Sequence, residues 1–118
     1  MLRQEFASAD PGSKALARIL REGVIHTEVQ ALRLNDLILV GLPGEVMTST
    51  GMKLQRIFPQ AAVVELANDS VGYILTPEAE VEGGYETGLH LSSRVTSGAE
   101  ALLLDAVTGV LKEPALSR

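Results

Sequence analysis

A glutamate follows directly after an apolar run and a tight turn. Residues 37–40 (Leu-Ile-Leu-Val) are the most continuous apolar run in the first half of the chain, and residues 41–45 (Gly-Leu-Pro-Gly-Glu) come next. A short aliphatic run that stops at Gly and Pro is typical of a buried strand. We therefore expect Glu45 at the carboxyl end of that strand, where α/β proteins commonly keep their chemistry. The structural alternative is a carboxylate at the start of the next helix, which the helix dipole favours.

The two tyrosines of the chain both lie in segments with neighbouring glycines. Tyr73 belongs to residues 68–78 (Asn-Asp-Ser-Val-Gly-Tyr-Ile-Leu-Thr-Pro-Glu), and Tyr85 belongs to residues 83–86 (Gly-Gly-Tyr-Glu). A phenol has a free pKa of about 10, so it binds zinc only beside an ion that other ligands already hold. The alternative for each tyrosine is a ring that covers a surface edge.

Taken in this order, the three segments resemble the C-terminal part of the catalytic domain of the neutral ceramidases, in their compact bacterial form. These are zinc amidohydrolases that split ceramide into sphingosine and a fatty acid. The similarity runs from about residue 28 to residue 110. The resemblance implies that Glu45 and Tyr73 are zinc ligands and that Tyr85 helps to bind the amide oxygen of the substrate. It also implies that zinc polarises the amide carbonyl and activates water.

The family's remaining zinc ligands have no counterpart in this sequence. They are two histidines that lie upstream of the Pro-Gly-Glu turn, together with a catalytic serine, and no part of the 118 residues corresponds to that region. His26 lies on an alternating strand pattern and His90 lies after Tyr85, so neither matches a family ligand. The C-terminal immunoglobulin-like domain of the longer members is also missing. Catalytic zinc needs about three protein ligands, so we expect weak zinc binding and no activity from the chain alone.

The resemblance therefore suggests the last third of a catalytic domain, as a truncated gene product, a fragment or one half of a split enzyme. The expected partner is a second copy or a complementary N-terminal lobe, and a lipid amide is the expected substrate. Two alternatives stay open. One is a non-catalytic α/β module that uses the old cleft for protein or lipid contact, and the other is hydrolysis of a different amide or lactam, because a fold does not fix a substrate. A neighbouring reading frame for a histidine-bearing lobe would favour the split enzyme.

Two further sets of residues do not form a recognisable site. No Gly-x-Ser-x-Gly elbow accompanies the possible nucleophile set, so a serine hydrolase is not expected. The set consists of Asp69, His90, Ser92 and Ser93. An acidic stretch lacks the ordered spacing of an EF-hand and is expected to be a solvated loop. Its members are Glu78, Glu80, Glu82 and Glu86.

Length and composition limit the remaining possibilities. A chain of 118 residues forms one domain at most, residues 1–118, and 46% hydrophobic but 3% aromatic residues predict an aliphatic core. The net charge of −5 without a basic stripe argues against nucleic-acid binding. There is no cysteine, no apolar run of membrane-spanning length and no apolar signal region at the N-terminus. The compartment is left open.

The elements that position these residues can be inferred from the hydrophobic pattern. Residues 14–22 predict a helix with a glycine stop at Gly23. Residues 24–34 and 37–42 predict a hairpin around Asn35 and Asp36. A helix over residues 46–58, closed by Pro59, and a strand over residues 61–67 follow. A right-handed crossover would bring Glu45 and Asn68 to the same edge of the sheet.

The last third of the sequence predicts a long loop and a helix. Residues 77–94 are expected to be an ordered loop with a short helix near Pro77 and a strand near Leu89, and a capping box opens a helix over residues 97–112. The predicted fold class is α/β (mixed α+β), a mixed sheet with a hairpin and a strand–helix–strand crossover, packed by two or three helices. Because the chain would represent only part of a larger sheet, at least one strand edge and an apolar face should be left uncovered, which again predicts a dimer or a partner chain.

Overall fold

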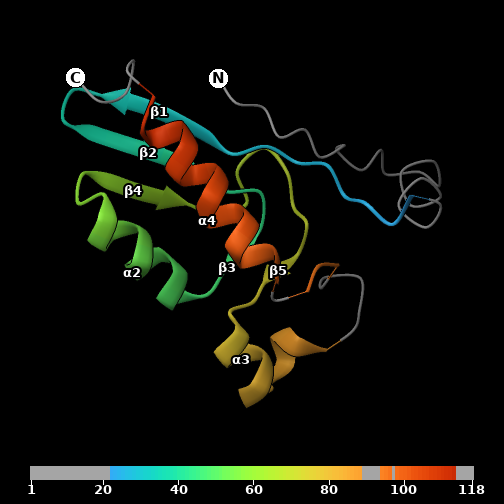
Figure 1. The fold of residues 1–118 in the computed structure, drawn as a ribbon. Helices are drawn as coiled ribbons and strands as arrows, with labels where there is room; N and C mark the ends of the chain where they lie inside the picture. The colour runs from blue at the N-terminus through green and yellow to red at the C-terminus, as the bar shows by residue number, and fades with distance from the viewer. Residues whose placement is uncertain (1–21, 89–93, 97, 114–118) are drawn as a thin grey trace.

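The computed structural model describes residues 22–88, 94–96 and 98–113 (Figure 1). Two small sheets and three helices make up this part of the chain, which confirms the predicted mixed fold class. In chain order the elements are β1 (Gln30–Leu34), β2 (Leu37–Gly41), β3 (Glu45–Val46), α2 (Thr48–Ile57), β4 (Ala61–Val64), β5 (Tyr73–Ile74), α3 (Pro77–Glu82), the 3-10 turn η1 (Tyr85–Thr87) and α4 (Gly98–Leu111).

The larger sheet has the strand order β1-β2-β4. The hairpin prediction is confirmed: β1 and β2 pair antiparallel, with Leu34 opposite Leu37. Asn35 occupies the turn with a φ of 55°, a conformation that asparagine tolerates better than most residues. The crossover prediction is also confirmed, because β2 and β4 pair parallel with α2 between them in the chain.

The hydrophobic core lies between one face of this sheet and the helices α2 and α4. Figure 1 shows α4 crossing the sheet, with α2 beside β4. The core is aliphatic, as the composition predicts, and its members come from the strands, both helices and the connecting loops: Ile38, Val40, Leu42, Val46, Leu54, Ala61, Val71, Ile74, Leu103, Val107 and Leu111. Burial of these side chains is the main stabilising contribution in a domain of this kind.

A partly buried ion pair joins the two helices. Glu100 of α4 is 4% exposed, and its Oε1 accepts hydrogen bonds from Thr50 Oγ1 at 2.7 Å and Lys53 Nζ at 3.0 Å. The first residue of the predicted capping box, Ser97, lies outside the described residues. Within them, Glu100 connects α4 to α2.

The strand predicted over residues 24–34 is too long. Only Gln30–Leu34 forms a strand, and residues 23–29 are an extended arm without regular structure. The reason lies in the partner strand, because β2 ends at Gly41 opposite Gln30 and the chain then turns away through Pro43, which has no N–H to donate. Of the predicted N-terminal helix, Glu22 is helical and Gly23 has the positive φ, 65°, of a helix stop, while the rest lies outside the described residues.

The remaining helix predictions are confirmed within a few residues. The short helix near Pro77 is α3, and its N-cap Thr76 accepts a hydrogen bond from the Ala79 N–H at 3.1 Å. α3 has no buried residue. The strand expected near Leu89 lies outside the described residues. Among the helices of the described part, none is long and apolar enough to cross a bilayer.

Candidate functional site

The predicted ligands Glu45 and Tyr73 lie side by side. Glu45 belongs to β3 and Tyr73 to β5, two short parallel strands in which Glu45 pairs with Tyr73 and Val46 pairs with Ile74. The sequence did not predict this two-stranded ladder. Since successive side chains point to opposite faces, one face of the ladder carries Glu45 and Tyr73 and the other carries the buried Val46 and Ile74.

A close backbone contact fixes this ladder. The Glu45 N–H donates to the Gly72 carbonyl at 3.1 Å, and the Val71 N–H donates to the Pro43 carbonyl at 2.7 Å. A Cβ at Gly44 would lie 2.6 Å from the Gly72 oxygen, which is closer than real Cβ contacts. The two backbones can therefore approach only because position 44 is glycine.

The ends of β2 and β4 also meet, as the crossover predicts. The Leu66 N–H donates to the Gly44 carbonyl at 3.2 Å, and the Ala67 N–H donates to the Leu42 carbonyl at 2.9 Å. The loop after β4 thus lies directly beside the Pro-Gly-Glu turn. After this loop the chain enters β5, which pairs with β3.

Asn68, the other residue predicted at this edge, has a structural role. Its φ is 68°, and its side-chain amide donates to Gln30 Oε1 at 2.8 Å. The neighbouring Asp69 accepts a hydrogen bond from Thr27 Oγ1 at 3.0 Å. These two contacts attach the loop to β1 and to the preceding arm, and the side chain beside Glu45 is that of Tyr73 instead.

Tyr85, the predicted substrate-binding residue, completes a cluster with the other two. Its ring meets the ring of Tyr73 edge to face, with centroids 6.1 Å apart and an interplanar angle of 85°. Such a T-shaped pair is a favourable aromatic geometry. Tyr85 is 71% exposed, whereas Tyr73 and Glu45 are half-buried, so Tyr85 forms the outer side of the cluster.

The electrostatics of the cluster keep Tyr73 protonated. Partial burial, the charge of Glu45, the neighbouring Tyr85 and the charge of Glu86 all raise the pKa of the Tyr73 phenol above its ordinary value, and a hydrogen bond to the Glu45 carboxylate adds to the shift. In the metal-free chain Tyr73 is therefore a neutral phenol at neutral pH that donates its proton toward Glu45.

The sequence reasoning missed two carboxylates near this cluster. Glu86 was assigned to a solvated acidic loop, yet it is close enough to Tyr73 to influence its pKa. The sequence did contain a feature that could have identified Glu86, because Glu86 follows Tyr85 directly in the motif. No sequence feature pointed to Glu65. Its Oε1 accepts a hydrogen bond from the Val46 N–H at 3.3 Å, which satisfies a backbone donor of β3.

The described residues contain no group of three His, Cys, Asp or Glu side chains arranged to hold a metal ion. Glu45 and Tyr73 offer two oxygen donors, whereas a catalytic zinc site has three protein ligands and one open position. His26 lies in the arm, on the wall of a separate cavity, and His90 lies outside the described residues.

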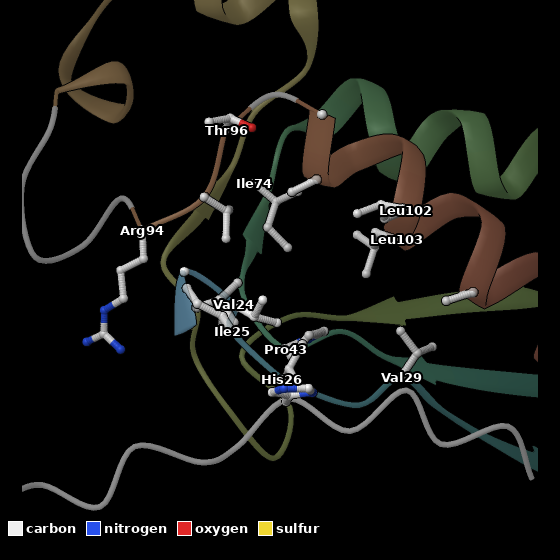
Figure 2. A pocket seen from close by; sticks show the side chains of 17 residues that line it. Val24, Ile25, His26, Val29, Pro43, Ile74, Arg94, Thr96, Leu102 and Leu103 are labelled. Atoms are coloured by element: carbon white, nitrogen blue, oxygen red, sulfur yellow. The ribbon is translucent and has the colours of Figure 1, made fainter. Parts of the chain in front are cut away.

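That cavity has a volume of about 850 Å³ and lies between the arm, α4 and the apolar face of the ladder. Figure 2 shows side chains of the arm, including Val24 and Ile25, together with Ile74 and with Leu102 and Leu103 of α4 around it. Since Ile74 points to the face opposite Tyr73, the cavity lies behind the Glu45–Tyr73 cluster. Its lining is mainly aliphatic.

Comparison with known proteins gives one informative likeness. No family model and no solved structure matches the chain significantly. The chain is similar to the neutral ceramidase of Mycobacterium tuberculosis (strain ATCC 25618 / H37Rv), with 34% identity over 74 residues, 56% of this chain and 12% of the relative. The match thus spans about an eighth of the relative's length. It supports a distant and partial relationship of this chain to the neutral ceramidases.

Proposed function

We propose that this chain is the C-terminal part of a ceramidase-like amidohydrolase and contributes Glu45, Tyr73 and Tyr85 to an active site that residues outside this sequence complete. The observation that carries the proposal is the side-by-side placement of Glu45 and Tyr73 in the β3–β5 ladder, with the Tyr85 ring against Tyr73. The likeness to a neutral ceramidase supports the reaction class.

The residues of the cluster have distinct roles in this proposal. In the completed site, the Glu45 carboxylate and the Tyr73 oxygen would be two ligands of a zinc ion, with the remaining ligands supplied from outside this sequence. Tyr85 is the most exposed member of the cluster, and its hydroxyl would donate a hydrogen bond to the amide oxygen of the substrate. The part that completes the site is a histidine-bearing lobe, and the substrate class is an N-acyl amide of a lipid.

Reconstitution tests the proposal. We mix the full chain with a lobe that carries the family's histidines and serine, add zinc, and measure hydrolysis of an N-acyl sphingoid amide. Tyr85→Phe should lower turnover by about 10- to 1,000-fold with little change in bound zinc, the range for loss of one oxyanion donor. Glu45→Ala should remove zinc and activity together.

A matched control separates these effects from general damage. His26→Ala lies on the wall of the cavity behind the ladder, away from the cluster, and should leave turnover unchanged. Unchanged turnover in Tyr85→Phe would remove Tyr85 from the site. If every combination of lobes failed to hydrolyse an N-acyl sphingoid amide, any other amide or a lactam, the amidohydrolase proposal would be wrong.

The second candidate is a non-catalytic α/β binding module. The observation that favours it is the aliphatic cavity of about 850 Å³ between the arm and α4, which needs no metal to accept a ligand. The two candidates differ in a simple respect. A binding module keeps its ligand affinity after Glu45→Ala, whereas the amidohydrolase loses its function.

A further inference from the structure

The segment that carries Tyr85 is attached to the core at its beginning. Leu75 and Thr76, which lead into α3, are 3% and 2% exposed, and the Thr76 hydroxyl caps the helix by accepting from the Ala79 N–H. Along α3 itself no residue is buried, and Figure 1 shows this helix apart from α2 and α4. Burial fixes the start of the segment, so the direction in which the chain leaves α3 decides where Tyr85 lies.

Two successive glycines set that direction. Gly83 has a φ of 76° and a ψ of −169°, and Gly84 has a φ of 126° and a ψ of −172°. This combination of a positive φ with an extended ψ is essentially restricted to glycine, because a Cβ would clash with the backbone. The path from α3 to Tyr85 therefore depends on two neighbouring residues that have no side chain.

The turn that follows the glycines is closed by its own hydrogen bonds. The Thr87 hydroxyl donates to the Gly84 carbonyl at 2.8 Å, and the Thr87 N–H donates to the same carbonyl at 3.3 Å. The Gly88 N–H donates to the Tyr85 carbonyl at 3.3 Å. A threonine hydroxyl that binds a backbone carbonyl three positions earlier stabilises such a turn locally. Tyr85 is therefore held within η1 and takes the direction that the turn as a whole is given.

We propose that Gly83, Gly84 and the Thr87 hydroxyl are positioning residues for Tyr85. The two glycines direct η1 toward the β3–β5 ladder, and Thr87 maintains the shape of the turn, so that the Tyr85 ring lies against Tyr73. This inference rests on the proposed amidohydrolase function, in which Tyr85 binds the substrate. The three residues act through Tyr85 and need no contact with the substrate themselves.

Alanine at position 83 tests the backbone conformation without a steric clash. A Cβ at Gly83 would meet nothing within 4 Å. The Gly83 N–H already donates to the Ala79 carbonyl at 3.1 Å, so alanine needs only a negative φ to extend α3, and alanine favours the helix. One more helical residue rotates the following chain by about 100°, since a turn takes about 3.6 residues. Tyr85 would then point away from Tyr73.

The alternative is that the contact between the rings holds Tyr85 in place. An edge-to-face pair is favourable, and the two centroids are 6.1 Å apart. Tyr85 is 71% exposed, however, so its ring buries little surface in that contact. The two explanations differ in one outcome: a contact that holds itself survives Gly83→Ala, whereas a contact that the glycines direct does not.

Nuclear magnetic resonance of the full chain tests the placement without any activity. The sequence has two tyrosines, so tyrosine labelling isolates the rings of Tyr73 and Tyr85. We expect a nuclear Overhauser effect between the two rings in the wild type, and we expect Gly83→Ala to abolish it. The matched control is Gly51→Ala inside α2, where a Cβ also meets nothing within 4 Å and the signal between the rings should be preserved.

A second pair of variants covers the case in which Gly83→Ala fails to fold. Thr87→Val removes the hydroxyl and keeps the branched shape, whereas Thr87→Ser keeps the hydroxyl. We expect valine to weaken the signal between the rings and serine to retain it. Retention by serine is specific to the hydrogen bond with the Gly84 carbonyl, because both substitutions alter the side chain.

Turnover of the reconstituted enzyme tests the same residues in the proposed reaction. Gly83→Ala should lower turnover by about 10- to 1,000-fold, as Tyr85→Phe does, with little change in bound zinc. In a Tyr85→Phe background, Gly83→Ala should cause no further loss, because it acts through the Tyr85 hydroxyl. If no lobe restores hydrolysis, the amidohydrolase proposal is wrong, and the signal between the rings still decides the role of the glycines.

Three results would overturn the positioning proposal. The first is a wild type without the signal between the rings, or a Gly83→Ala variant that keeps it at full strength. The second is an equal loss of the signal in Thr87→Ser and Thr87→Val, which would exclude the hydroxyl as the group that holds the turn. The third is a further loss of turnover from Gly83→Ala in the Tyr85→Phe background.

Discussion

The pKa of Tyr73 is the most direct experimental probe of the arrangement of the site. Tyr73 lies beside Glu45 on the neighbouring strand, its ring contacts the ring of Tyr85, and it lies near the charge of Glu86. Each of these neighbours disfavours the phenolate. Tyr73 therefore reports on the whole cluster through a single titration.

We predict that Tyr73 ionises at a higher pH than an ordinary tyrosine in the metal-free chain, and that Glu45→Gln lowers its pKa. The physical reason is the removal of a negative charge and of the carboxylate acceptor. Ultraviolet absorbance of tyrosinate against pH, in a Tyr85→Phe background, measures the change. An unaltered titration after Glu45→Gln would show that the two side chains do not interact.

The raised pKa also has a defined effect on stability. The unfolded chain loses the Tyr73 proton at about pH 10, and the folded chain loses it at a higher pH. The contribution of protonated Tyr73 to the free energy of unfolding is therefore complete below pH 10, and it is lost as the pH rises through the pKa of the folded state. The loss of stability in alkali should be smaller in Tyr73→Phe, which has no proton to lose.

A second residue-scale prediction concerns the glycine that lets the ladder form. Gly44→Ala should lower the free energy of unfolding by about 1–3 kcal/mol, because its Cβ would lie 2.6 Å from the Gly72 oxygen. Gly51 is the matched control, since a Cβ there meets nothing within 4 Å and the residue lies inside α2. Gly51→Ala should stabilise the protein by about 0.5–1 kcal/mol. Urea denaturation of both variants measures the contrast, and equal effects would argue against a special role for position 44.

At the scale of elements, the contact between α2 and α4 depends on a polar group in an aliphatic core. Thr50 is fully buried, and its hydroxyl donates to Glu100 at 2.7 Å. Lys53 supplies the countercharge for Glu100 from a partly exposed position. One carboxylate therefore links the two helices in addition to their apolar contacts.

We predict that Thr50→Val destabilises the fold by about 1–2 kcal/mol, the effect of removing one partner from a buried hydrogen bond. Thr48→Val, at the exposed start of the same helix, should change stability by less than about 0.5 kcal/mol. Thermal or urea unfolding distinguishes them. A Thr50→Val protein as stable as Thr48→Val would show that Lys53 alone satisfies Glu100.

Most of the helices and strands could be predicted from sequence patterns, but some could not. The hairpin, the crossover, α2, α3 and α4 follow from local signals such as turn residues, helical spacing and caps, and the structure confirms them. The β3–β5 ladder was not predicted because each of its strands has two residues and no periodicity. The role of Glu100 was missed for a related reason, since its partners lie about 50 positions away and only packing brings them together.

At the scale of the whole molecule, the described part of the chain brings three candidate residues from separate segments into one cluster. Motif order singled out Glu45, Tyr73 and Tyr85 as candidates, and the structure places them close together. Their proposed roles as ligands and substrate donor remain predictions. Zinc binding is the property that tests the proposed ligand roles most directly.

We predict that zinc binds the isolated chain weakly, without proton release from Tyr73. The reason is that two oxygen donors hold zinc poorly, and a neutral phenol loses its proton only to an ion that stronger ligands have already fixed. Calorimetric titration in two buffers of different ionisation enthalpy measures both affinity and proton release. Asn68→Ala is a suitable control, because its side chain lies in the same loop region and binds Gln30. Tight stoichiometric binding that Glu45→Ala abolishes and Asn68→Ala preserves would contradict the prediction. The missing ligands would then have to come from elsewhere, such as a second copy of the chain.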